Sequence, residues 1–95
     1  MRLSKFAEDT RVTNEVILEL DSARMLYADM NTLHEGYATI LEELDELWTK
    51  IKMNPAKLST TGQRELRERI RKEAIQVAAM AVRLVVDVCD NESNG

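Results

Sequence analysis

Two groups of oxygen-bearing side chains have a spacing that could support chemistry. The first is the run EELDE at positions 42–46, and the second is the pair Glu73 and Gln76. Residues three apart share one face of a helix, so Glu43 and Glu46 lie along one edge, as do Glu73 and Gln76. Carboxylate and amide oxygens are the ligands that Mg²⁺ and Mn²⁺ prefer. Carboxylates held this close repel unless a cation lies between them, so the pattern predicts a metal site if the two segments meet.

A second pattern favours a site, although an acidic run on a helix is more commonly a solvated face. Helical geometry places Gln76, Arg83 and Asp87 in one narrow sector with Glu73. These are the three polar residues of the otherwise apolar segment 74–89 (AIQVAAMAVRLVVDVC). Their alignment indicates a single polar stripe along the helix, on which Asp87 is a partner of the other polar residues. Arg83 and Asp87, four residues apart, are equally well spaced for a simple ion pair.

The elements that must position these groups are three helices, because apolar residues recur every three or four positions. With this period and only 95 residues, the chain is predicted to be a single all-α domain over residues 1–95, a bundle of three main helices. Residues 1–12 and 91–95 are expected to be irregular or frayed. The helices run from near Thr13 to Met30, from about Leu33 to Met53 and from about Gly62 to Asp90.

Local signals mark the ends of these helices. Thr32 precedes Glu35 by three residues, a capping-box pattern, and Thr60 precedes Gln63 in the same way. Pro55 ends the second helix because proline lacks the amide hydrogen that a helix needs. The face of the second helix that is predicted to be buried consists of Tyr37, Ile40, Leu41, Leu44, Leu47, Trp48 and Ile51.

Composition excludes several classes of protein. The chain has 95 residues, 44% of them hydrophobic, and a net charge of −4, which disfavours binding to a nucleic-acid polymer or an anionic membrane. Its single cysteine rules out an internal disulfide and a cysteine-rich zinc site. The apolar runs are shorter than a membrane span, and no signal-peptide core is present, so a cytoplasmic protein is expected.

The segment 74–89 is apolar nearly all round, which is typical of a buried helix. Two other helices in so short a chain cannot surround it. We therefore expect a second chain to complete the core, as a homodimer or a higher bundle.

Two stretches of the chain resemble the MazG-like nucleotide pyrophosphohydrolases of the all-α NTP pyrophosphatase superfamily. They are His34–Lys52 (HEGYATILEELDELWTKIK) and Arg67–Cys89 (RERIRKEAIQVAAMAVRLVVDVC). The family pattern is E-x-x-D on the later helix and E-E-x-x-E on the earlier one. The earlier element is intact here as Glu42, Glu43 and Glu46, whereas Gln76 stands where the later element usually has aspartate.

The resemblance implies a helical bundle that forms dimers or tetramers and hydrolyses a nucleoside triphosphate to the monophosphate and pyrophosphate with Mg²⁺ (Mn²⁺ being a possible substitute). Phosphoryl chemistry of this kind needs neutralised phosphate oxygens and a positioned water. The metal ligands would be Glu43, Glu46 and Glu73, with Gln76 in the fourth position. Catalysis at the water is assigned to Glu42 and Glu43, and contact with phosphate to Arg83, Lys50 or the basic patch Arg64–Lys72.

Gln76 leaves two alternatives open. An amide oxygen can bind Mg²⁺ but carries no charge, so metal affinity falls. The site then either works with fewer acidic ligands, or the chain is a non-catalytic helical-bundle or nucleotide-binding member of the family.

Overall fold

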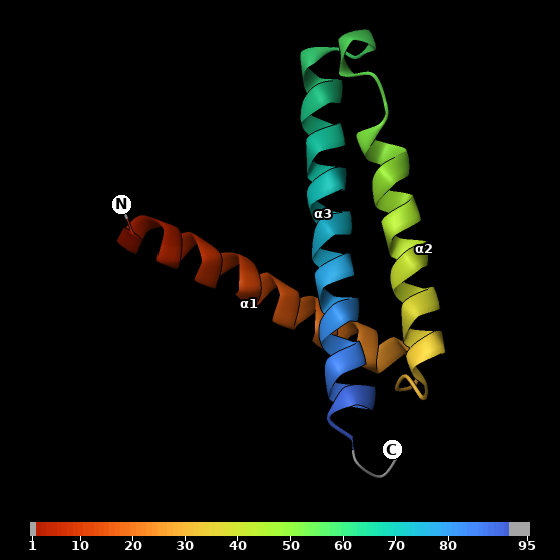
Figure 1. Cartoon of the computed structure of the whole chain (residues 1–95). Coiled ribbons are helices and arrows are strands. Elements are labelled where there is room, and N and C mark those ends of the chain that lie inside the picture. The colour runs from red at the N-terminus through yellow and green to blue at the C-terminus, as the bar shows by residue number, and fades with distance from the viewer. Residues whose placement is uncertain (1, 92–95) are drawn as a thin grey trace.

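Three long helices make up almost the whole fold, as predicted. A computed structural model describes residues 2–91, with side chains from residue 5 onward, and every regular element in that range is a helix. Residues 92–95, most of the predicted frayed tail, lie outside the described residues. The elements are α1 (Arg2–Leu26), α2 (Leu33–Ile51), the 3₁₀ turn η1 (Pro55–Lys57), α3 (Thr60–Leu84) and the π-helical turn η2 (Val85–Cys89), which continues α3 (Figure 1).

Helix α1 starts earlier than hydrophobic periodicity predicts. It begins at Arg2, so the prediction of irregular structure over residues 1–12 is wrong for the described part of that segment. Its described side chains form no apolar stripe there, and local contacts such as the Lys5–Glu8 ion pair at 3.6 Å support the helix. Because local ion pairs produce no apolar repeat in the sequence, periodicity could not predict this part of the helix. The helix also ends at Leu26, before the last apolar positions assigned to it.

The start of α2 is capped as predicted. The Thr32 hydroxyl oxygen accepts a hydrogen bond from the Glu35 amide at 3.0 Å, which satisfies one of the free amides of the first turn. The helix ends at Ile51, and Pro55 opens the short turn η1 that follows.

The start of α3 is capped one residue before the predicted position. Ser59, not Thr60, is the capping residue, and its hydroxyl oxygen accepts from the Gly62 amide at 3.0 Å. The Gln63 side chain does not complete a capping box. Its amide nitrogen instead donates to the carbonyl of Pro55 at 3.1 Å, and so ties the inter-helix loop to the first turn of α3.

Helices α2 and α3 form an antiparallel hairpin, and α1 crosses behind α3 at a steep angle (Figure 1). Gly36 packs closely against α3, since a Cβ built there would clash with the Leu84 Cδ1 atom. The small core lies where α1 crosses α3. It consists of Val16, Ala23, Met30, Ala79 and Met80, with Leu20, Ile40, Ile75, Ala78, Leu84 and Val88 packed around them.

A buried ionic contact fixes the connection between α1 and α2 against the end of α3. The Asp87 carboxylate accepts from the Met30 amide at 3.0 Å and lies 2.9 Å from the Arg24 guanidinium. The Arg83 guanidinium donates to the Ala28 carbonyl at 2.6 Å and places its Nε 3.8 Å from Asp87. Arg83 and Asp87 are both nearly inaccessible, so this end of the stripe predicted from the sequence is an internal tether.

Much apolar surface remains uncovered in a single chain. The accessible surface is 7384 Å², whereas a compact monomer of 10.9 kDa exposes about 5,600 Å². The radius of gyration is 15.8 Å, against about 12 Å for a compact domain of this length. No helix within residues 2–91 is both long and apolar enough to cross a bilayer.

The predicted buried face of α2 divides into two. Ile40 and Leu47 are partly buried, but the other members are exposed within one chain, with Tyr37 at 64% and Trp48 at 59%. The prediction that these side chains belong to the core is therefore wrong for the single chain. A helical period identifies an apolar face without saying which neighbour covers it. The exposed members are Tyr37, Leu41, Leu44, Trp48 and Ile51.

We predict that Asp87→Asn destabilises the fold by about 3 kcal/mol or more, because it leaves buried arginine charge uncompensated. Asp29→Asn is the matched control, since Asp29 also pairs with Arg24, at 3.2 Å, but has a side chain 75% exposed. Its cost should stay below about 1 kcal/mol. Urea unfolding followed by circular dichroism measures both. Equal losses in the two variants would show that the buried tether is not what stabilises this end of the molecule.

Candidate metal centre

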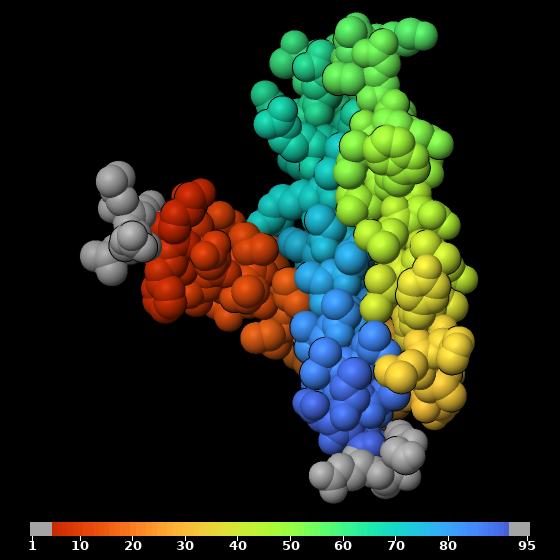
Figure 2. Space-filling view, in the orientation of Figure 1, coloured from red at the N-terminus to blue at the C-terminus, as the bar shows by residue number. Residues whose placement is uncertain are grey.

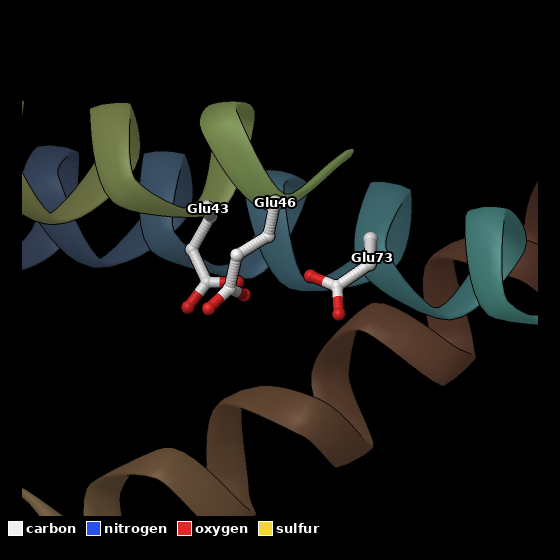
Figure 3. Close-up of side chains that lie close together, drawn as sticks. All are labelled: Glu43, Glu46 and Glu73. Atoms are coloured by element: carbon white, nitrogen blue, oxygen red, sulfur yellow. The ribbon is translucent and has the colours of Figure 1, made fainter. Parts of the chain in front are cut away.

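Three carboxylates from two helices converge beside the crossing of α1. Glu43 and Glu46 come from α2, Glu73 comes from α3, and one carboxylate oxygen of each lies within 4.8 Å of the others. All three side chains point toward the side along which α1 passes (Figure 3). Glu46 is exposed, whereas the Glu73 side chain is only 13% exposed. The antiparallel hairpin thus brings together the two acidic segments that are about thirty positions apart in the sequence.

Gln76 joins the same cluster one turn further along α3. With its amide nitrogen turned inward, it donates to Glu43 Oε2 at 3.3 Å and to Glu73 Oε2 at 3.1 Å. With the oxygen turned inward, the same side chain adds a fourth oxygen facing the same point. The position expected for the fourth ligand is therefore adjacent to the three acids, and the neutral amide can serve either as a donor or as an acceptor there.

Crowding of negative charge is visible in the pKa of Glu43. This pKa is raised to about 7, chiefly by burial and also by the nearby charges of Glu46 and Glu73, a hydrogen bond with Glu73 and the charge of Glu19. A proton and a metal ion relieve the same repulsion. The cluster is consequently a place where positive charge is favoured at neutral pH.

Lys50 already supplies part of that positive charge. Its ammonium group lies 3.4 Å from Glu73 Oε1, with 27% of the side chain exposed. Lys50 was predicted as a phosphate contact, and the structure places it at the edge of the acid cluster, paired with one of the acids. It stands where it could neutralise either a carboxylate or an anionic ligand.

A cavity of about 580 Å³ lies next to the acids, between α1 and the hairpin. Its walls include Glu42 and Glu43 from α2, Gln76 and Arg83 from α3, and Glu19 from α1. Of the predicted site residues, these four from α2 and α3 line the cavity. Asp87 is turned away from it, into the tether beside Arg24.

Glu19 is a site residue that sequence reasoning missed. Its charge acts on Glu43, and it lines the cavity from the opposite wall. A signal was present, because Glu19 lies three residues after Val16 and four before Ala23, at the edge of the apolar stripe of α1. The apolar stripe does not show which residues of α1 lie opposite the acid cluster.

In comparisons with known proteins, the chain matches no family model, no curated protein and no solved structure. The resemblance to the MazG-like enzymes therefore rests on its two sequence segments alone.

The raised pKa of Glu43 predicts a pH-dependent stability. Between the ordinary value of 4.5 and about 7, the folded chain binds more protons at Glu43 than the unfolded chain, so this contribution to stability is lost as the pH rises through about 7. Without divalent metal, Glu43→Gln should therefore raise the melting temperature at pH 8 and change it little at pH 4. Asp45→Asn, which removes an exposed charge from the same helix, should show no such trend. A stability difference for Glu43→Gln that does not grow with pH would contradict this.

Proposed function

We propose that this protein is a Mg²⁺-dependent nucleoside triphosphate pyrophosphohydrolase of the MazG-like all-α type, which converts a triphosphate to the monophosphate and pyrophosphate. The observation that carries the proposal is the convergence of Glu43, Glu46 and Glu73 within 4.8 Å at the edge of a cavity.

The donor set fits a hard divalent cation. Glu43, Glu46 and Glu73 would hold Mg²⁺ or Mn²⁺, with the Gln76 amide oxygen as a neutral fourth ligand. When bound, the ion would neutralise negative charge on the phosphate oxygens of the substrate. The raised pKa of Glu43 supports this fit, because repulsion among the acids is the energy that a cation would relieve.

The cavity has a size and a charge that agree with a metal-dependent anionic substrate. A volume of about 580 Å³ lies within the range of small-molecule sites. Its described walls carry Glu19, Glu35, Glu42 and Glu43 against the single cation Arg83, which already donates to the Ala28 carbonyl. A polyphosphate would be repelled by these walls alone. Binding of substrate is accordingly expected to depend steeply on divalent metal.

Two carboxylates are candidates for orienting or deprotonating the attacking water molecule. Glu42 is exposed on the cavity wall, next in sequence to Glu43 and outside the group of three convergent acids. It is free to orient an attacking water by accepting a hydrogen bond from it. Glu43 borders the same cavity and would orient the water as a ligand of the metal, because a bound cation removes the cause of the raised pKa that the metal-free carboxyl shows.

A second function, a non-catalytic helical-bundle protein, is favoured by one specific observation. Lys50 and Gln76 can both satisfy the acids without any metal, through the 3.4 Å ion pair and the amide hydrogen bonds. In that case neither Mg²⁺ nor nucleotides would shift the melting temperature.

Either function includes self-association, as a homodimer or homotetramer in the cytoplasm. The support is the roughly 1,800 Å² of surface exposed beyond that of a compact monomer of this mass.

The test is pyrophosphate release from a panel of ribo- and deoxyribonucleoside triphosphates, with and without Mg²⁺. Release is expected only with divalent metal. Glu73→Gln should weaken Mg²⁺ affinity by at least roughly tenfold, the loss that even outer-shell partners of a metal cause, and should abolish turnover. Asp45→Asn should leave turnover unchanged, since this side chain is exposed and outside the cluster. No release from any nucleotide by the pure protein would overturn the proposal.

Restoring the family's usual acid gives a gain-of-function prediction. Gln76→Asp adds a fourth negative charge facing the other three, so it should tighten Mg²⁺ binding and lower the melting temperature in its absence. Isothermal titration with Mg²⁺ and melting in a chelator measure the two effects. Gln76→Ala is the control, because it removes the amide without adding charge and should not tighten binding.

A further inference from the structure

The cavity between α1 and the hairpin has two unlike ends. Its acid end holds one polar residue from each helix, and its far end lies beside the loop that joins α1 to α2. The acid end is marked by Glu19, Glu43 and Gln76, and the far end by Tyr27, Glu35 and Arg83. On α2 and α3 the two ends are eight and seven residues apart, or about 10–12 Å. The cavity therefore has a direction, from the acid cluster to the loop.

Beyond the acids, the cavity has an apolar floor and an aromatic wall. Ala23, Met30 and Met80 line it and are each at most 7% exposed, whereas Tyr27 is 64% exposed. Only the second half of α1 contributes, and in Figure 2 the first half projects away from the hairpin. An exposed tyrosine stacks on flat rings, and methionine sulfur packs favourably against their edges. This part of the cavity is therefore suited to a flat, uncharged ring rather than to phosphate.

Glu35 adds a hydrogen-bond acceptor to the far end. Its backbone amide is satisfied by the Thr32 hydroxyl, whereas its side chain is exposed on the cavity wall, and no cation within residues 5–91 pairs with it. An ionised carboxylate accepts hydrogen bonds and donates none. The exocyclic amino groups of cytosine, adenine and guanine are donors, whereas uracil and thymine present carbonyl oxygens in the equivalent place. Glu35 thus favours a base that carries an amino group.

We propose that the far end of the cavity holds the base of the nucleotide, stacked on Tyr27, and that Glu35 accepts a hydrogen bond from its exocyclic amino group. The inference rests on the proposed function and names its substrate class, the nucleotides of amino-bearing bases. The triphosphate then extends toward the acid end, about 10–12 Å away, where the divalent cation would lie. Arg83 stays bound to the Ala28 carbonyl beside the base, so contact with phosphate falls to Lys50 at the acid cluster.

Nucleosides test the far end by themselves, because they carry no phosphate, need no metal and cannot be hydrolysed to pyrophosphate. Titration of the whole chain with cytidine, adenosine and uridine, followed by NMR, should perturb the signals of Tyr27 and Met80. Uridine should bind roughly tenfold more weakly than cytidine, the effect of one lost base contact. Absence of binding by every nucleoside, or equal affinity for cytidine and uridine, would overturn the proposal.

A pair of tyrosine variants separates stacking from a general effect on the fold. Tyr27→Ala should weaken binding of every nucleoside roughly tenfold, as loss of one stacking contact does, whereas Tyr27→Phe should retain it. Tyr37→Ala is the matched control, since Tyr37 is also 64% exposed but lies on α2 outside the cavity walls. Circular dichroism checks that each variant keeps its helix content. Equal losses in Tyr27→Ala and Tyr37→Ala would refute the stacking role.

A pair of acid variants tests the choice of base. Glu35→Gln should remove most of the preference for cytidine over uridine, because an amide can donate to a carbonyl as well as accept from an amino group. Asp29→Asn is the control, since it removes an exposed charge from the neighbouring loop but does not line the cavity. It should leave the preference unchanged. A preference that survives in Glu35→Gln would refute the role of this carboxylate.

Pyrophosphate release distinguishes failure of this inference from failure of the proposed function. The ratio of kcat/KM for CTP to that for UTP should follow the nucleoside preference, and Tyr27→Ala should raise KM more than it lowers kcat. Selective nucleoside binding at Tyr27 without any pyrophosphate release would refute the proposed function and support the base site. Release that is equal from CTP and UTP and unaffected by Tyr27→Ala would refute the base site and leave the proposed function standing.

Discussion

Helix α3 is the one element against which the others are held, since α1 and α2 each pack on it far more than on one another. Its sides are used for different purposes. One side meets α2 through Glu73 and Gln76, another meets α1 through Ala79, and the end of the helix holds the loop between them through Asp87. The position of the acids relative to the cavity follows from this division, because the acids of α2 and the cavity wall of α1 are both placed by the contacts of their helices with α3.

The acidic site was predictable in outline because its information is local. Spacings of three place Glu43 with Glu46, and Glu73 with Gln76, on single helix edges, and the short loop at Pro55 forces their two helices to be antiparallel neighbours. The structure brings these four side chains together as expected. Whether they hold a metal is a matter of chemistry rather than of fold.

The features that could not be predicted are those that depend on which helix or loop packs against each helix face. Periodicity marked Trp48 and Tyr37 as apolar-face residues but could not tell a core from an interface. The same stripe argument grouped Arg83 and Asp87 with the acids, although the backbone groups that they bind, at Ala28 and Met30, belong to a loop with no hydrophobic period. The contribution of Glu19 depends on the angle at which α1 crosses, which no local pattern encodes.

The short connection between α2 and α3 has a consequence for the order of folding. The acids of the cluster lie on two helices joined by a single short loop, whereas the α1 contacts with α3, such as Glu15 with Arg71, span more than fifty residues of chain. Contacts between near neighbours in sequence form faster than distant ones, since less loop entropy is lost. We therefore expect the acid cluster to assemble first, together with the hairpin that carries it. Docking of α1 would follow and enclose acids that are already side by side.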